Sequence, residues 1–353
     1  MSRAAYVTLA ATVAFALSGL AAGLLIHEHG GAAGAAAWVA RTAVIVSLAV
    51  ALGGGLLLIL RLRRRVRPRA AGWALTVVAV ALFAFFVVQP AVFAVYLTHL
   101  PARRAVHDAD LGAPKRDVTL TTASGLKLRG WYVPSRNGAA VLLIHGTGSN
   151  RVGVAGHARL LVRHGYGVLL MDLHGHGTSE GRSTSVGWDA DEDTDAALDF
   201  LRRQPDVHGG RIGILGVSLG GEVAIEAAAR HPEWRAAVLE GVQGGTPADV
   251  RAMDADPAST VTLIELYGLG RLLAGSAPPP SRAGLIEEIA PRPVLLLSSG
   301  RGGEARANEA MLRRGGSTTQ LWNLPAASHA SALRTDPAAY ERRVVGFLDR
   351  ALD

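Results

Sequence analysis

Residues 212–230 read Ile-Gly-Ile-Leu-Gly-Val-Ser-Leu-Gly-Gly-Glu-Val-Ala-Ile-Glu-Ala-Ala-Ala-Arg, and this stretch decides the fold. Its first six residues are apolar or small, as in a short buried strand. The residues from Leu219 to Arg230 then form a helical pattern. Between the two stands Ser218 in the pattern Gly-x-Ser-x-Gly. A tight strand-to-helix turn of this kind lifts a serine hydroxyl above the edge of a sheet.

The glycines of this turn have a steric reason. Side chains at positions 216 and 220 would collide with neighbouring backbone if the turn is that tight. The turn also aims the N–H of Leu219 at a substrate from a helix N-terminus, where partial positive charge favours an oxyanion. We therefore expect Ser218 to be a nucleophile; the alternative is a glycine-rich turn without catalysis.

Working outward, short apolar runs alternate with helical patterns from residue 117 to 353. The expected strands are 117–122, 126–133, 140–145, 167–172, 212–217, 236–240, 293–298 and 320–324. The expected helices are 152–164, 186–203, 219–230, 304–314 and 337–352. The alternation predicts an α/β domain: a mostly parallel sheet with helices on both faces and ligands at the carboxyl ends of the strands.

Another glycine-rich turn, His145-Gly146-Thr147-Gly148, directly follows a predicted strand. A glycine-rich turn at this place lets a backbone N–H point into the site, and we expect Thr147, the residue after His-Gly, to supply the second oxyanion N–H. We expect His145 to hold the turn rather than to act as the base, because the expected chain order is serine, acid, histidine.

The candidate base and acid lie in later loops. His329 follows the last predicted strand, where it can accept the serine proton, and the ordinary pKa of histidine suits that task near neutral pH. Glu304 follows strand 293–298 and could orient the imidazole, or could merely favour a helix N-terminus. Glu240, at the end of strand 236–240, competes for the acid role.

These motifs together resemble those of the α/β-hydrolase superfamily over residues 117–353. A further likeness is Asp172-Leu-His-Gly-His-Gly-Thr-Ser179, which is similar to the superfamily's Asp-x-Arg-Gly-x-Gly-x-Ser turn. Two departures are His174 where arginine is usual, and Glu304 where most members carry aspartate slightly earlier. The resemblance implies esterase, lipase, thioesterase, peptidase or related acyl chemistry without a cofactor. Asp172, His174 and His176 are better explained as a structural turn than as metal ligands, so no metal is expected.

The N-terminal part of the chain differs in character. Its three apolar runs, at about 4–26, 35–60 and 70–97, each approach or exceed the ~20 residues needed to cross a bilayer. We predict three transmembrane helices within residues 1–100 and a linker at 101–116. The first run could instead be a cleaved signal peptide. Pro90 is expected to kink the third run.

Charge predicts how this region is oriented. Six arginines lie between positions 61 and 69, whereas residues 27–34 contain no Lys or Arg. The positive-inside rule places the arginine loop in the cytoplasm and the C-terminal domain outside, at the cell membrane. Four basic residues just past the third run oppose this: Arg103, Arg104, Lys115 and Arg116. Residues 105–353 are nearly neutral, which disfavours nucleic-acid binding. The chain has no cysteine, which excludes disulfides and thiolate catalysis.

Residues 241–292 form a long insertion between predicted strands. We expect it to act as a lid, with ordinary packing on the sheet edge as the alternative, and its apolar content favours a hydrophobic acyl substrate. Five acidic residues at 189–195 are expected to lie on a solvated helix N-terminus.

The prediction is thus a membrane-anchored serine hydrolase acting on a small ester, thioester or amide. The alternatives are a non-catalytic tethered scaffold or an acyltransferase with the same triad. The oligomeric state is left open.

Overall fold

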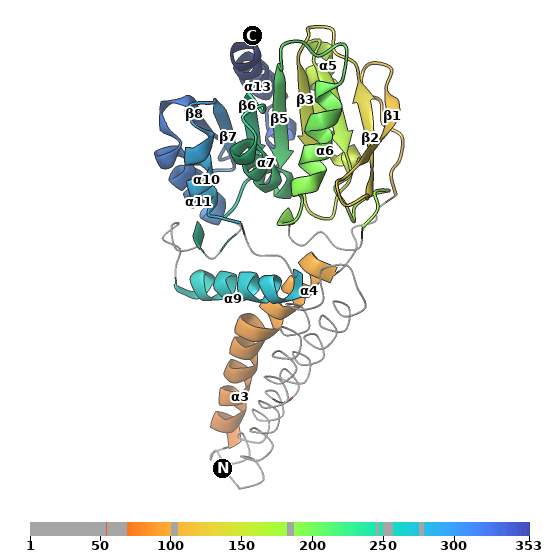
Figure 1. Cartoon of the computed structure of the whole chain (residues 1–353). Helices are drawn as coiled ribbons and strands as arrows, with labels where there is room; N and C mark the ends of the chain where they lie inside the picture. Colours follow the sequence, from red (N-terminus) through yellow and green to blue (C-terminus); the bar gives the residue numbers. More distant parts are fainter. Residues whose placement is uncertain are drawn as a thin grey trace. The chain divides into compact units, whose positions relative to one another are not determined.

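The structure, a computed structural model, describes residues 54, 69–99, 105–181, 187–244, 246, 248–249, 257–274 and 279–353 (Figure 1). The chain divides into two compact units. One comprises Met1–Thr98 and Pro257–Ala277, and the other comprises His99–Asp256 and Pro278–Asp353. Each unit is described by itself.

The first unit is helical in its described part. The helices α3 (Arg69–Phe83), η1 (a π-helix, Ala84–Val88) and α4 (Gln89–His99) follow one another without a break, and α9 (Pro257–Ala274) packs against η1. The π-turn lies just before Pro90, whose missing N–H removes a bond from the regular helical ladder. Several large apolar side chains are exposed here: Val77, Val78, Leu82, Phe85 and Val92.

The predicted transmembrane helices are not supported by the structure. The first two, at about 4–26 and 35–60, lie outside the described residues apart from position 54. The third, at about 70–97, is divided into α3 and α4, of 15 and 11 residues, by the π-helix between them. Across the described part of the chain, no helix is both long enough and apolar enough to cross a membrane.

The second unit is built on one eight-stranded sheet. Its order is β1-β2-β4-β3-β5-β6-β7-β8, in which β2 is antiparallel to both β1 and β4 and all other neighbours are parallel. The strands are β1 Arg116–Thr121, β2 Lys127–Val133, β3 Ala140–Ile144, β4 Gly167–Met171, β5 Ile212–Val217, β6 Ala236–Glu240, β7 Val294–Ser298 and β8 Thr319–Asn323.

Helices cover both faces of this sheet (Figure 1). On one face, α5 packs on β4, and α13 packs on β5 and β6. On the other face, α7 is flanked by α6 and α10, and α11 packs against β7 and β8. The helices are η2 Arg151–Val154, α5 Ala155–Arg163, α6 Asp191–Arg202, α7 Leu219–Arg230, α10 Arg282–Ile289, α11 Gly302–Arg314, η4 Gly316–Thr318, α12 Ala332–Thr335 and α13 Pro337–Leu352.

The strands alternate between two apolar layers. In β5, Leu215 and Val217 join the core cluster with α5 and α13, while Ile214, the residue before Leu215, is fully buried on the opposite face. Because both faces are covered, β3 to β7 are buried along their whole length. The prediction of a mostly parallel sheet between two helical layers is confirmed.

The largest difference from the predicted helix boundaries is at the start of α6. The helix expected from residue 186 begins at Asp191, because Gly187 adopts a left-handed φ of +81°, which a regular α-helix does not allow. A Cβ at Gly187 would also stand 2.8 Å from Leu219 Cδ1. The helical pattern in the sequence therefore included residues of a turn that packing against Leu219 requires.

Candidate active site

The turn between β5 and α7 is as tight as the glycines indicated. Ser218 has φ 56° and ψ −118°, a conformation that costs a non-glycine residue about 1–3 kcal/mol. A Cβ at Gly216 would lie 2.0 Å from the carbonyl oxygen of Gly220, and one at Gly220 would lie 2.3 Å from that of Ile144. The predicted collisions at positions 216 and 220 are thus confirmed.

Three predicted residues meet above this turn. His329 Nε2 lies 2.9 Å from Ser218 Oγ, and His329 Nδ1 lies 2.8 Å from Glu304 Oε2. They come from three separate places: the β5–α7 turn, the first turn of α11 and the loop after β8. The structure therefore joins serine, imidazole and carboxylate in one hydrogen-bonded chain.

The Glu304 carboxylate is buried and ionised. Its side chain is 4% exposed, and its other oxygen, Oε1, accepts the N–H of Ser299 at 2.6 Å. Burial alone would raise the pKa of Glu304, but the hydrogen bonds with His329 and Ser299 outweigh burial and hold the pKa below its usual value. Glu304 also lies in the first turn of α11, so the two roles weighed for it from sequence are compatible.

The His329 imidazole is half exposed, with 44% of its side chain accessible. The hydrogen bond to Glu304 raises its pKa above 6.5, against the opposing effect of burial. A neutral ring that donates Nδ1–H to Glu304 leaves Nε2 free to accept the Ser218 proton. Gln243 Nε2 also lies 3.4 Å from His329 Nδ1. Sequence reasoning missed Gln243, because nothing in the insertion's sequence marks it.

The two predicted oxyanion donors lie at this same edge. Leu219 is the first residue of α7, directly after Ser218. The turn that carries Thr147 packs against the nucleophile, since a Cβ on Gly146 would lie 3.2 Å from Ser218 Cβ. The register supports this, because Ile144 at the end of β3 pairs with Gly216.

His145 is fully buried and holds the turn. Its Nε2 accepts the N–H of Leu173 at 3.2 Å, so Nδ1 carries the proton and donates to the carbonyl of Gly146 at 2.9 Å. Burial lowers the pKa of His145 to about 4, which keeps the ring neutral. The structure thus gives His145 the structural place that chain order indicated.

Glu240, the rival acid, faces other partners. Its Oε2 lies 3.2 Å from His157 Nε2, and its Oε1 accepts the N–H of Ala332 at 2.8 Å. The geometry therefore favours Glu304 as the carboxylate partner of His329.

The turn after β4 is a separate polar cluster. Asp172, fully buried, accepts the N–H of Arg151 at 2.7 Å and that of Thr178 at 2.9 Å, and forms an ion pair with the Arg151 guanidinium at 2.5 Å. A Cβ at Gly177 would lie 2.1 Å from the Asp172 carboxylate. The residues of this motif therefore fix the turn rather than face a ligand.

His174 stands between two carboxylates in this cluster, Asp189 at 3.3 Å and Asp193 at 3.1 Å. Burial opposes its charge, but the hydrogen bonds to both aspartates outweigh burial and raise the pKa of His174 to about 11. His174 is therefore a cation where the superfamily pattern has arginine. Asp193 is only 1% exposed, so the expectation of a wholly solvated acidic face was wrong there.

His176 behaves in the opposite way. Burial, together with the nearby ring of His145 at 4.7 Å, lowers its pKa to about 3. One histidine of the possible metal motif is thus bound to carboxylates as a cation, and the other is neutral and buried. Within the described ranges no group of three or more His, Cys, Asp or Glu side chains is placed to hold a metal ion.

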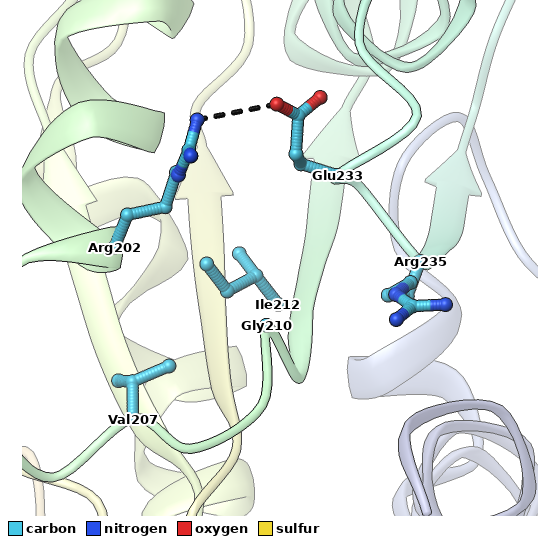
Figure 2. Close-up of a pocket in the computed structure, with 6 residues that line it drawn as sticks. All are labelled: Arg202, Val207, Gly210, Ile212, Glu233 and Arg235. Atoms are coloured by element: carbon cyan, nitrogen blue, oxygen red, sulfur yellow. Dashed lines mark hydrogen bonds and ion pairs between the residues drawn. The ribbon is translucent and has the colours of Figure 1, made fainter.

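A hollow of about 290 Å³ lies at the opposite edge of the sheet (Figure 2). It is lined by residues at the starts of β5 and β6, among them Ile212 and Arg235, and the Arg202–Glu233 ion pair, 3.2 Å long, borders it. Parallel α/β sheets place ligands at the carboxyl ends of the strands, where Ser218 lies, so this hollow is not part of the candidate site.

Residues 135–272 match the family model described as serine aminopeptidase, S33. An uncharacterized protein of Mycobacterium tuberculosis strain H37Rv is 37% identical over 140 residues, 38% of this chain. The thiohydrolase aneE of Aspergillus aculeatus is 37% identical over 116 residues, 32% of this chain. These alignments span 49% and 36% of the two relatives' own lengths.

Solved structures extend the likeness to a larger share of the chain. An esterase of Pyrococcus furiosus superposes with a TM-score of 0.61 at 23% identity, covering 72% of this chain and 99% of the esterase. The α/β-hydrolase GrgF from a Penicillium species gives a TM-score of 0.55 at 20% identity, covering 68% of this chain and 99% of that protein. The second unit has the α/β-hydrolase fold. With the family match and the thiohydrolase relative, the α/β-hydrolase fold supports an enzyme of this type.

Proposed function

We propose that the α/β-hydrolase domain is a serine hydrolase that cleaves a carboxylic ester, thioester or amide. The observation that carries the proposal is the chain Ser218 Oγ–His329 Nε2 at 2.9 Å and His329 Nδ1–Glu304 Oε2 at 2.8 Å. A serine hydroxyl is a weak nucleophile until a base within hydrogen-bond reach can take its proton.

The first half of the reaction forms an acyl-enzyme. Ser218 Oγ attacks the substrate carbonyl carbon as its proton passes to His329 Nε2, and Glu304 stabilises the imidazolium. The amides of Leu219 and Thr147 donate to the developing oxyanion. Collapse of this intermediate breaks the bond to the leaving group, which takes the proton from His329.

The second half releases the acid. Water gives a proton to His329 as its oxygen attacks the acyl carbon, and the second tetrahedral intermediate expels Ser218, which recovers the proton. The water oxygen ends in the carboxylic acid product. No cofactor enters either half.

An ester or thioester is the substrate class that the comparisons support best, because the relatives named above include an esterase and a thiohydrolase. The serine aminopeptidase match supports an amide as the second choice. A p-nitrophenyl ester series from acetate to laurate, with matched thioester and aminoacyl-anilide substrates, tests this order on the full-length protein and on Ser218→Ala. Turnover by Ser218→Ala equal to that of the wild type would contradict the proposal.

Two other outcomes of this experiment have defined meanings. Transfer of the acyl group to an added alcohol in preference to water would identify an acyltransferase. Absence of turnover on every substrate by folded protein would favour a non-catalytic scaffold.

We also propose that the N-terminal region attaches the enzyme to the cell membrane, with the hydrolase domain on the outer side. Three apolar runs and the arginines at 61–69 support this. Reporter fusions at the C-terminus test the orientation: alkaline phosphatase should be active and a green fluorescent protein dark when exported through the general secretory route. The reverse pattern would contradict the orientation.

A further inference from the structure

A second buried carboxylate, Glu240, connects both halves of the candidate active site. It is the last residue of β6 and is 2% exposed. Its backbone carbonyl accepts the N–H of Ser218 at 2.7 Å, and it pairs with Val217 in the register of β5 and β6. The main chain of Glu240 thus holds the nucleophile's own amide.

The side chain of Glu240 holds the loop that carries the base. Its Oε1 accepts the N–H of Ala332 at 2.8 Å, three residues after His329. The other oxygen, Oε2, lies 3.2 Å from His157 Nε2, which fixes the carboxylate from α5. One residue therefore contacts the nucleophile through its backbone and the base-bearing loop through its carboxylate.

The next residue, Gly241, packs against the same loop. Its φ is +69°, and a Cβ there would lie 3.2 Å from both Ala330 N and His329 Cε1. The backbone after β6 therefore lies directly under the imidazole of His329. A small displacement of the loop would therefore change the length of the Ser218–His329 hydrogen bond.

The charge of Glu240 is retained despite its burial. Burial alone would raise the pKa of Glu240, but hydrogen bonds from His157 and the Ala332 amide outweigh burial and lower the pKa. Burial and this neighbouring carboxylate raise the pKa of Tyr340 on α13 well above 10. The site under the loop thus holds an anion among donors, the arrangement that fixes a backbone amide firmly.

We propose that Glu240 is a positioning residue that sets the spacing between Ser218 and His329 by fixing both to the end of β6. It does not touch the reacting atoms, and Glu304 remains the carboxylate on the imidazole. The inference rests on the proposed function, because its consequence is a rate. Misplacement of catalytic groups by about 1 Å can cost on the order of 10²-fold in rate.

The test compares Glu240→Met, which keeps the volume but removes the acceptor, with Glu240→Gln, which keeps an oxygen for Ala332 and removes the charge. The full-length protein is assayed on p-nitrophenyl butyrate, and active enzyme is counted by fluorophosphonate titration. We expect Glu240→Met to lose about 10–100-fold in kcat with KM within about twofold, and Glu240→Gln to recover most of that loss. If Glu240→Met does not fold, Glu240→Asp gives the same comparison, because it keeps the charge but withdraws the acceptor.

Asp206→Asn is the matched control. Asp206, like Glu240, accepts a backbone N–H, that of Ser135 at 2.6 Å, and it also accepts the hydroxyl of Tyr132 at 2.6 Å. It precedes β5 and so lies at the opposite edge of the sheet. Asp206→Asn should lower Tm while leaving kcat per titrated site within about threefold.

The outcomes separate the two proposals. Wild type that hydrolyses the ester, with kcat per site unchanged in Glu240→Met, would overturn the positioning role alone. Equal losses in Glu240→Gln and Glu240→Met would also overturn it, since an acceptor oxygen for the Ala332 N–H would then not restore the rate. A wild type with no turnover and no titratable serine would instead overturn the proposed function.

Discussion

Two histidines at the same edge of the sheet, His329 and His174, are both bound to carboxylates, yet only His329 also contacts a serine hydroxyl. His329 has one carboxylate partner, is 44% exposed and has its second ring nitrogen on a serine hydroxyl. His174 has two carboxylate partners and is 10% exposed, which raises its pKa to about 11. A base needs a partner that orients it without fixing its charge. In this pair, one carboxylate, solvent exposure and a serine hydroxyl on the second ring nitrogen mark the catalytic histidine, whereas two carboxylates and burial mark the structural one.

The largest predicted effect is on the catalytic side of this comparison. His329→Gln should lower kcat/KM by about 10³–10⁴-fold with a change in Tm of only a few degrees, because the serine loses its base while the half-exposed site loses little packing. His174→Gln is the matched variant and should stay within about tenfold of wild type. Equal losses in the two variants would break the comparison.

A smaller loss is expected from Glu304→Gln, about 10²–10³-fold in kcat. The carboxylate raises the pKa of His329, so replacing it should move the acid limb of the kcat/KM profile to lower pH. The sign follows because only the neutral imidazole accepts the proton, and activity falls as pH drops through its pKa. A limb that stays in place, or moves to higher pH, would show that Glu304 is not its partner.

The structural cluster should respond in stability instead of rate. Asp172→Asn leaves the buried Arg151 cation without its counter-charge, and we expect a loss of about 3–5 kcal/mol in the free energy of unfolding. Urea denaturation of the full-length protein in detergent measures this. A loss below about 1 kcal/mol would contradict the proposed role of the turn.

The smallest effect is the pH dependence of His174. Because its folded pKa is raised to about 11, its stabilisation is complete below about pH 6.5 and is lost progressively as pH rises toward 11. His174→Gln should therefore lower Tm at pH 6, and the gap from wild type should narrow by pH 10. A gap that widens with rising pH would contradict the charged state assigned to His174.

Much of the fold could be predicted from local pattern. The bounds of β5, α7, β6 and α13 agree with the predicted ones, and local chemistry decides some of these ends: Gly241 follows β6 and Pro337 begins α13. The order of the motifs along the chain indicated which loops would meet Ser218, because carboxyl ends of parallel strands share an edge. His329 and Glu304 could therefore be named before their contact was seen.

The remainder depended on tertiary structure. Glu240 and Glu304 both follow strands near the serine, and only the directions of their side chains separate them. The charge of His174 could not be predicted, since the turn at 187–190 brings Asp189 to it from outside the motif. Gln243 lies near the start of the insertion, outside the helical pattern that the insertion contains, and the lid role of the insertion stays a prediction.

The central claim is that His329 activates Ser218, and peptide mapping after treatment with a fluorophosphonate tests it most directly. The account predicts that wild-type protein carries the phosphonyl group on the tryptic peptide containing Ser218, that Ser218→Ala carries none, and that His329→Gln reacts at least about 10²-fold more slowly. Labelling of His329→Gln at the wild-type rate, or labelling at another serine in both variants, would contradict it.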